Sequence, residues 1–291
     1  METHNRRTFV KTAAIGSLGL LAASKISFAP SVPEPGIQLY TVRDAMKAYA
    51  KDTLAQVSKL GYKNLELAGY SNGKFYGMEP VEFRKVVEDL GMKVISSHTG
   101  VEVKGVDTGN AQKMAEDHAK IGVKYCVQPW LVEERRKTAD SYKKFVDELN
   151  LVAEVMKKSG IRFGYHNHDF EFKKVDNVIP FYDIYLKNAD PKLMTFELDL
   201  YWATKAGHNP VDIFRKYPGR FELWHVKDME NSADKFFAPV GTGTINFKEI
   251  FAHQKDSGLK YYFVEQDATR DNKPMDAIKT SIDNLKSKIL K

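Results

Sequence analysis

Apolar and polar positions along the chain switch between a helical and a strand-like spacing, and the switch recurs in one phrase. The phrase runs glycine, apolar residue, basic residue and then a β-prone stretch, as in "KLGYKNLEL", "DLGMKVISS" and "KSGIRFGYH"; its glycines are Gly61, Gly91, Gly122, Gly160 and Gly258. A glycine directly after a helical pattern signals a helix end, because it adopts the left-handed conformation at little cost. Each phrase therefore predicts a helix end, a tight turn and the start of a strand.

The segments before these glycines carry helical stripes. Apolar residues recur at helical spacing over 142–156, and shorter stripes occupy 83–90 and 275–289. Such stretches separate eight β-prone runs: 36–41, 63–68, 93–98, 123–128, 161–166, 193–199, 221–226 and 260–265. Strands that alternate with helices form parallel sheets, and eight such units predict a single closed (β/α)8 TIM barrel, an α/β fold. An open doubly wound sheet is the alternative, but no G-x-G-x-x-G motif follows the first strand.

The first thirty residues have a different character. Arg6 and Arg7 precede an uncharged, mildly apolar run over 12–24, and a proline-rich stretch follows. The run is too short to span a bilayer. The pattern resembles a twin-arginine export signal, with an ordinary secretory signal as the alternative. We therefore expect 1–30 to be a signal segment and 31–291 to be the barrel of an exported, periplasmic protein that is not an integral membrane protein.

Composition and charge exclude some functions. The 291 residues carry a formal net charge of +6, of which the first thirty residues contribute +3, and no basic stripe with interleaved aromatics is present. Nucleic acid is therefore not an expected partner. Cys126 is the only cysteine, which excludes disulfides and thiolate metal clusters within the chain. The sequence leaves open whether the protein forms a homo-oligomer.

Metal-capable side chains gather where four successive strands end. The active site of a (β/α)8 barrel lies at the C-terminal ends of its strands, and residues two apart share a strand face. "GYHNHDFEF" ends the fifth strand with His166, "ELDLYW" the sixth with Asp199, "HVKD" the seventh with His225, and "YFVEQD" the eighth with Glu265. Buried carboxylates and imidazoles are costly unless they are paired or bind a cation. This set predicts one divalent metal ion, with Mn, Zn and Co about equally suited.

Other polar and aromatic residues near these strand ends are candidates with two readings each. Substrate contact is predicted for His98, His168, Glu171, Trp130, Trp202 and Glu197, because aromatic faces pack against apolar surfaces of a ligand and polar side chains bind its hydrogen-bonding groups. The alternatives are a structural histidine at 98, loop capping by 168 and 171, rim packing by the tryptophans, and support of the metal ligands by Glu197. Lys227 either stabilises a negatively charged oxygen of a ligand or pairs with Asp228 or Glu197.

With these residues in view, the chain resembles the xylose isomerase-like barrels, a family that includes sugar phosphate isomerases/epimerases, sugar 3-epimerases, inosose dehydratases and endonuclease IV relatives. The resemblance extends over nearly all of 31–291, and "HVKD" followed by "VGTGTINF" is its most specific part. It implies one divalent ion held by residues of strands five to eight, which in the sugar epimerases are Glu, Asp, His and Glu. Asp199, His225 and Glu265 fall on the last three of these positions.

His166 departs from that pattern, because it stands where the epimerases carry a glutamate. The resemblance implies enolisation next to a metal-bound sugar carbonyl, with Glu265, His166 and Lys227 as the expected catalytic residues. Two carboxylates on opposite faces of the sugar would complete an epimerisation, whereas a histidine here looks more like the inosose dehydratase branch.

Three functions therefore remain. The first is a metal-dependent isomerase or epimerase of a small, unphosphorylated sugar. The second is a lyase or dehydratase acting on a keto-sugar or keto-glycoside, and the third is a non-catalytic periplasmic sugar-binding barrel. The glycines of "VGTGTINF" could suggest a phosphate cradle, but we expect a flexible loop that feeds a helix beginning at Phe247.

Overall fold

The computed structural model describes residues 32–100 and 108–291, and Val32–Lys291 form one compact unit. The predicted signal segment lies outside the described residues, so export remains a prediction. Within the described part of the chain, no helix combines the length and the hydropathy that a transmembrane span requires.

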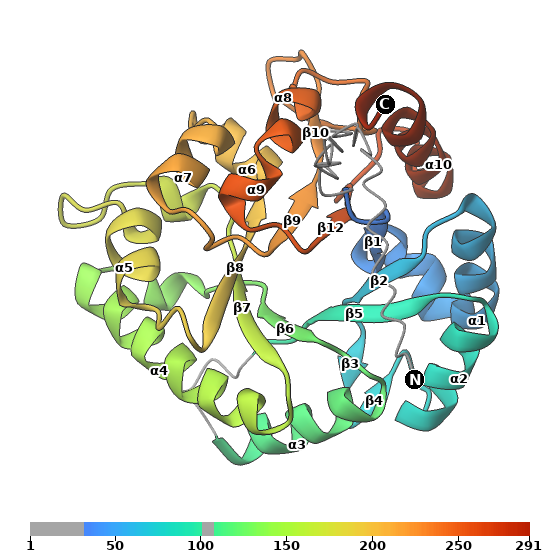
Figure 1. Cartoon of the computed structure of the whole chain (residues 1–291), viewed down its shortest axis with the longest axis horizontal. Helices are drawn as coiled ribbons and strands as arrows, with labels where there is room; N and C mark the ends of the chain where they lie inside the picture. The colour runs from blue at the N-terminus through green and yellow to red at the C-terminus, as the bar shows by residue number, and fades with distance from the viewer. Residues whose placement is uncertain (1–31, 101–107) are drawn as a thin grey trace, which may run out of the picture. The chain divides into compact units, whose positions relative to one another are not determined.

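Eight parallel strands close into a barrel in the order β1, β12, β9, β8, β7, β6, β5, β2 (Figure 1). Their bounds are Gly36–Gln38 (β1), Asn64–Leu67 (β2), Lys93–His98 (β5), Tyr125–Gln128 (β6), Arg162–His166 (β7), Met194–Asp199 (β8), Leu223–Val226 (β9) and Tyr261–Val264 (β12). All eight lie within the runs expected from the sequence. The predicted TIM barrel is confirmed, and the open doubly wound sheet is excluded.

Helices surround the barrel in Figure 1. They are α1 (Arg43–Leu60), α2 (Pro80–Asp89), α3 (Thr108–Lys120), α4 (Ala139–Lys158), α5 (Leu186–Asn188), α6 (Leu200–Lys205), α7 (Pro210–Lys216), α8 (Phe247–Ala252), α9 (Gln254–Ser257) and α10 (Pro274–Asn284). Short helical turns are η1 (Leu39–Val42), η2 (Glu133–Arg135), η3 (Phe170–Phe172), η4 (Pro180–Tyr185) and η5 (Leu285–Ile289). The apolar stripe of α4 is buried along its whole length, as its spacing predicts.

The recurring glycines lie in the turns between helices and strands. All five have positive φ angles, from 69° at Gly91 to 96° at Gly61. The repeated phrase therefore marks a helix end and a tight turn, as predicted. Glycine is needed there because this backbone region is open to glycine and strained for most other residues.

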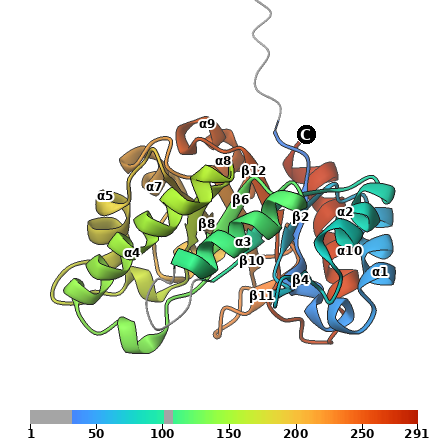
Figure 2. The same ribbon diagram turned by 90° about the horizontal axis from the view of Figure 1, so that it is seen from below.

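Two hairpins extend the strand ends. They are β3 (Tyr70–Ser71) with β4 (Lys74–Phe75), and β10 (Asp228–Met229) with β11 (Phe237–Ala238). Figure 2 shows β4 and β11 at the same end of the barrel. Because β3 directly follows β2 and β10 directly follows β9, this is the end at which the parallel strands terminate.

The barrel interior changes from apolar to polar toward that end. A small apolar cluster packs inside it: Ile95, Tyr125, Val127, Leu223 and Phe263. Leu223 and His225 share a face of β9, and Phe263 shares a face with Glu265. The alternation of each strand therefore places its polar residue directly above the apolar layer. Trp224, between Leu223 and His225, is fully buried against Phe214, with the rings stacked 4.9 Å apart, as expected of a core residue.

Candidate active site

A cavity of about 550 Å³ opens at the C-terminal ends of the strands. The described residues that line it are Tyr40, Ala68, His98, Pro129, Trp130, His166, His168, Asp169, Trp202, Lys227, Glu265 and Asp267. They come from the C-terminal ends of all eight barrel strands or from the segments that directly follow them. The cavity is therefore assembled by barrel closure rather than by any single stretch of sequence.

Three of the four predicted metal ligands form a compact cluster, which we call the outer cluster: Asp199, His225 and Glu265. Their nearest ligand atoms lie within 4.8 Å of one another. His225 Nδ1 lies 2.7 Å from Glu265 Oε2 and 3.9 Å from Asp199 Oδ2. The fourth, His166, is not part of this group but lies beside it, with Nε2 3.8 Å from Asp199 Oδ2. The pairing of Asp199 with His225 across β8 and β9 explains the convergence, because it sets the two side chains at the same height.

A second carboxylate layer lies beneath this cluster. Glu197 Oε2 is 2.7 Å from His98 Nε2, 3.1 Å from His166 Nδ1 and 3.1 Å from His225 Nε2. One buried oxygen therefore faces three imidazoles. His166 and His225 each direct one ring nitrogen toward Glu197 and the other toward the outer cluster, which fixes the orientation of both rings.

Glu66, at the end of β2, completes this layer. Its Oε2 accepts a hydrogen bond from Gln38 Nε2 at 2.9 Å and lies 2.5 Å from His225 Nε2. His98, His166, Glu197 and His225 also bring ligand atoms within 4.8 Å of one another, so these side chains form a second group with metal-ligand spacing. We call Glu66, Glu197 and His98 the inner layer.

Lys227 places a positive charge at the edge of the outer cluster. Its Nζ lies 2.7 Å from Glu265 Oε2, 3.1 Å from Asp199 Oδ2 and 2.9 Å from Asp267 Oδ1, and the side chain is 1% exposed. Burial alone would lower the pKa of this ammonium group, but the three carboxylates outweigh burial and hold the pKa well above its usual value. The expected pairing with Asp228 or Glu197 is therefore wrong.

Burial and neighbouring charges give the outer cluster distinct protonation states. Burial raises the pKa of Asp199 to about 6. For Glu265, burial acts in the same direction, but the charges of Lys227 and His225 hold its pKa well below the usual range. Burial, reinforced by the charge of His225, lowers the pKa of His166 to about 3. At neutral pH, Glu265 is a carboxylate and His166 is a neutral imidazole with a lone pair available to a ligand.

Several buried oxygens of the site have no hydrogen-bond partner within the described chain. They include Glu66 Oε1, Glu197 Oε1 and Asp199 Oδ2, the last with the Lys227 ammonium nearby. A buried carboxylate oxygen left unpaired is costly, and a bound cation removes that cost. Because imidazole nitrogens and carboxylate oxygens also suit Mn, Zn and Co, the residues fit a divalent ion.

The aromatic candidates line the cavity. Trp130 is 45% exposed, and its ring is held from behind by the Arg136 guanidinium, 4.2 Å from the ring centre. Trp202 faces the cavity from α6, where its backbone N–H donates to the Asp199 carboxylate at 2.8 Å. His168 lies between them, 4.5 Å from Trp130 and 5.5 Å from Trp202 by ring centres. These three rings give the cavity an aromatic wall.

Two residues expected to touch substrate do not line the cavity. Glu171 is fully buried, where it accepts hydrogen bonds from the Tyr165 hydroxyl at 2.6 Å and from the His168 backbone N–H at 2.8 Å. Glu197 is fully buried beneath the histidines. Direct substrate contact is wrong for both residues. The alternative predicted for Glu197, support of the metal ligands, agrees with its contacts. Glu171 bonds to Tyr165 and His168, which precede it, rather than to the following segment that it was predicted to cap.

Sequence reasoning missed Glu66, Asp267 and Tyr40. Asp267 lies two residues after Glu265, so the strand alternation that selected Glu265 could have found it. Glu66 is the polar residue at the end of the second strand and follows the same rule. Tyr40 lies in a helical turn directly after β1, and no periodic signal marks it.

The glycine-rich loop after β11 binds a carboxylate of the protein itself. Asp228 accepts hydrogen bonds from the backbone N–H groups of Gly241, Gly243 and Ile245 at 2.8–3.1 Å. A Cβ at Gly243 would collide with Asp228 and with the Met229 carbonyl. The loop is therefore an ordered internal cradle, not the flexible segment expected. As predicted, the helix that follows begins at Phe247.

A closed parallel barrel with a layered cluster of histidines and carboxylates at its C-terminal mouth defines a class of barrel enzymes. The model of the xylose isomerase-like TIM barrel family matches residues 54–288, and the chain belongs to that family. The resemblance drawn from the sequence is thereby confirmed at the level of the family.

Among the relatives of this chain, some are named as dehydratases and others as isomerases/epimerases. An inosose dehydratase of Geobacillus kaustophilus (strain HTA426) is 23% identical over 240 residues, which cover 70% of this chain and 75% of that protein. A sugar phosphate isomerase/epimerase from Parabacteroides distasonis ATCC 8503 is similar in structure, with a TM-score of 0.78, 30% identity, and coverage of 93% of this chain and 99% of that one. The IOLI protein, whose structure contains a zinc atom, has a TM-score of 0.68 and 17% identity, covering 86% of this chain and 96% of that one.

Proposed function

We propose that this protein is a divalent-metal-dependent enzyme that removes the proton next to the carbonyl of an unphosphorylated sugar and acts as an isomerase or epimerase. The observation that carries the proposal is the cluster of Asp199, His225 and Glu265 beside the cavity, with His166 Nε2 3.8 Å from Asp199 Oδ2. Enolisation needs a base beside an acidic carbon and a positive group beside the carbonyl oxygen, and the site offers both.

The metal ion would be held by His166, Asp199, His225 and Glu265. When bound, it would polarise the substrate carbonyl and stabilise the negative charge that develops on its oxygen. The zinc atom in the structure of the IOLI protein, which has a similar fold, supports the proposal that this protein binds a metal. Glu197 would accept hydrogen bonds from the ring nitrogens of His166 and His225 that do not face the ion.

Glu265 is the proposed base, because it lines the cavity and its low pKa keeps it a carboxylate at neutral pH. Lys227 lies beside it and would donate a hydrogen bond to the developing enolate oxygen. His166 would be the second catalytic residue, on the side of the substrate opposite to Glu265. His98, His168, Trp130 and Trp202 would contact the sugar ring and its hydroxyls.

The charge of the cavity favours a substrate without phosphate. Among the described residues that line it, Lys227 is the only lysine or arginine, and three carboxylates already surround its ammonium group. The glycine-rich loop is likewise engaged by Asp228. A phosphate group would therefore meet carboxylates without a free cation to balance its charge.

Solvent deuterium incorporation tests the proposed first step. Protein loaded with Mn, Zn or Co is incubated with a panel of ketoses and aldoses in deuterated water, and the sugars are analysed by NMR and mass spectrometry. We expect deuterium next to the carbonyl of at least one sugar, and a loss of about 100-fold or more in Glu265→Gln. Tight sugar binding without exchange, unchanged in Glu265→Gln, would contradict the proposal and favour a non-catalytic sugar-binding barrel.

Elimination of a β-substituent is the second candidate, and the unlike pair His166 and Glu265 favours it. An epimerase returns a proton to the opposite face, for which two similar groups are suited, whereas a lyase needs one base and one acid. In a lyase, Glu265 would take the α-proton, and the β-hydroxyl or glycosidic oxygen would leave with a proton, forming a double bond conjugated to the carbonyl. The relatives named inosose dehydratase support this outcome. An ultraviolet-absorbing product from a keto-sugar or keto-glycoside would establish it, and reversible isomerisation alone would remove it.

A further inference from the structure

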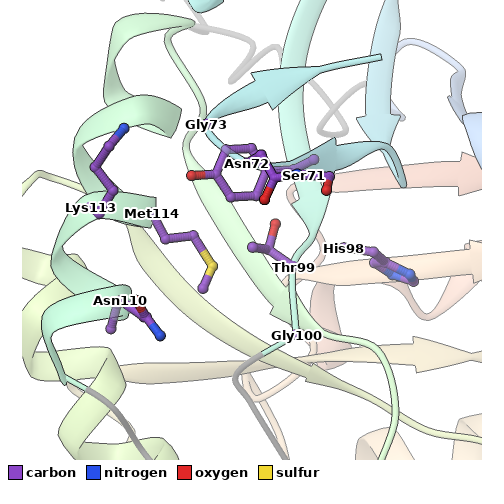
Figure 3. A pocket seen from close by; sticks show the side chains of 11 residues that line it. Ser71, Asn72, Gly73, His98, Thr99, Gly100, Asn110, Lys113 and Met114 are labelled. Carbon is purple, nitrogen blue, oxygen red and sulfur yellow. The ribbon is translucent and has the colours of Figure 1, made fainter. Parts of the chain in front are cut away.

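A second cavity of about 460 Å³ lies beside the proposed catalytic cavity. We call it the side cavity. Its described lining comes from three segments: Tyr70–Gly73 of the β3–β4 hairpin, 98–100 after β5, and 110–114 of α3. Figure 3 shows side chains from α3 on one side and His98 on the other, with the hairpin between them. None of the metal ligands proposed above lines this cavity.

His98 joins the two cavities, because it lines both. The short segment after β2 does the same, with Ala68 in the catalytic cavity and Tyr70 in the side cavity. The inner layer fixes the shared wall, since His98 Nε2 is 2.7 Å from Glu197 Oε2 and its side chain is 10% exposed. A ligand bound over Glu265 that extends past His98 therefore enters the side cavity.

The walls of the side cavity are fixed by a buried carboxylate. Asp117 of α3 accepts hydrogen bonds from the Tyr70 hydroxyl at 2.9 Å and from Lys120 at 3.0 Å, and it also pairs with Lys113. These bonds tie the hairpin to the helix. Because the opposing walls are joined by a buried group, the cavity belongs to the folded structure rather than to surface side chains.

The chemistry of this lining suits a neutral, hydroxyl-rich group. Asn72, Asn110 and Ser71 offer amide and hydroxyl groups that both donate and accept hydrogen bonds, while Tyr70 and Met114 offer apolar surface. Sugar rings need this combination, because their hydroxyl rims are polar and their faces are not. Lys113 is engaged by Asp117, so an anionic ligand would find no free cation among the described lining residues.

We propose that the substrate is a glycoside with two linked sugar rings, whose reacting ring occupies the catalytic cavity and whose second ring occupies the side cavity. This inference rests on the proposed function and extends it to the size of the substrate. His98 is the residue that both rings contact. Asn110 and Asn72 recognise the second ring, and the side cavity thereby selects glycosides over free monosaccharides.

The test blocks the side cavity without touching the catalytic residues. Asn110→Trp fills it from α3, where Asn110 is exposed, and Ala119→Trp adds the same bulk to the same helix at an exposed position that lines neither cavity. Asn72→Gly removes an amide with little strain, since Asn72 has a φ of 52°. Glucose, maltose and cellobiose serve as probes, with affinities measured by calorimetry on metal-loaded protein.

We expect the wild-type protein to bind at least one disaccharide about tenfold more tightly than glucose. Asn110→Trp should remove that advantage and leave glucose binding unchanged, Asn72→Gly should weaken disaccharide binding severalfold, and Ala119→Trp should behave as wild type. Equal affinities for glucose and both disaccharides, or an advantage that survives Asn110→Trp and Asn72→Gly, would overturn the proposal. Because the binding of these probes is measured apart from deuterium exchange, a failure of the proposed reaction would be seen separately.

Discussion

The Lys227 ammonium lies 2.7 Å from Glu265 Oε2, so one of the proposed metal ligands is already paired with a cation of the protein. The same ammonium is 3.1 Å from Asp199 Oδ2. Two of the four proposed ligands, Asp199 and Glu265, would therefore interact with the Lys227 ammonium as well as with any ion that they bind. On the proposed function, this sharing would lower metal affinity and would keep a hydrogen-bond donor beside the reacting carbonyl.

Removing that charge should strengthen metal binding. In Lys227→Met, a side chain of similar length, the carboxylates of Asp199 and Glu265 lose their competing cation, and affinity for Mn or Zn should rise about tenfold or more while turnover falls. Calorimetric titration of the apo protein measures the affinity. Lys205→Met is the matched control, because Lys205 contacts the Trp202 ring, 4.9 Å from its centre, but forms no ion pair with the residues that the structure describes. Weaker metal binding in Lys227→Met would contradict the shared-charge explanation.

Glu197 of the inner layer should matter for metal binding although it does not line the cavity. Glu197→Gln removes the charge that faces His98, His166 and His225, and we expect metal affinity to fall about 10–100-fold. Glu222→Gln is the control, because Glu222 precedes β9 at the other end of the barrel and pairs with Tyr125 and Arg162. Metal analysis after dialysis against a weak chelator gives the comparison. Equal metal retention by both variants would show that Glu197 does not support the ligands.

Periodicity and turn chemistry were enough to predict the barrel and the four residues of strands five to eight. Each of these signals is local: a glycine ends a helix, and alternation along a strand selects the inward side chains. The inner layer was harder to predict, because Glu66 and His225 are 159 positions apart and meet only when the barrel closes. The partners of Lys227 were hard to predict for the same reason, because they come from β8 and from the end of β12. Its neighbours in sequence suggested Asp228, which instead faces the glycine-rich loop.

The internal cradle should contribute strongly to stability. Asp228→Asn replaces an oxygen that accepts backbone N–H groups with an amide that donates, leaving at least one buried N–H unpaired. We expect a loss of roughly 2–4 kcal/mol in the free energy of unfolding. Asp52→Asn, at an exposed position of α1, should change it little. Urea unfolding followed by circular dichroism measures both variants. A loss in Asp228→Asn no larger than in the control would mean that the loop does not depend on this carboxylate.

His118 should make the stability of the barrel depend on pH. Its ring is buried on α3, where Nδ1 donates to the Met114 carbonyl at 2.7 Å and Nε2 faces the hydroxyls of Ser97 and Thr99. Burial lowers the pKa of this imidazole to about 4, and nearby Asp117 opposes that shift only in part. Unfolding restores a pKa near the ordinary value of about 6.5.

Between these two pKa values the unfolded chain binds a proton that the folded protein does not, so the free energy of unfolding falls as the pH is lowered from about 6.5 to about 4. The contribution of His118 to this fall is about 3 kcal/mol. In His118→Gln this contribution is absent. The difference in the free energy of unfolding between wild type and variant should therefore be smaller at pH 4 than at pH 7 by that amount. His253→Gln, at a partly exposed position, controls for the loss of an imidazole. Urea unfolding at a series of pH values gives the two curves, and parallel curves for wild type and His118→Gln would show that His118 is not the buried titrating group.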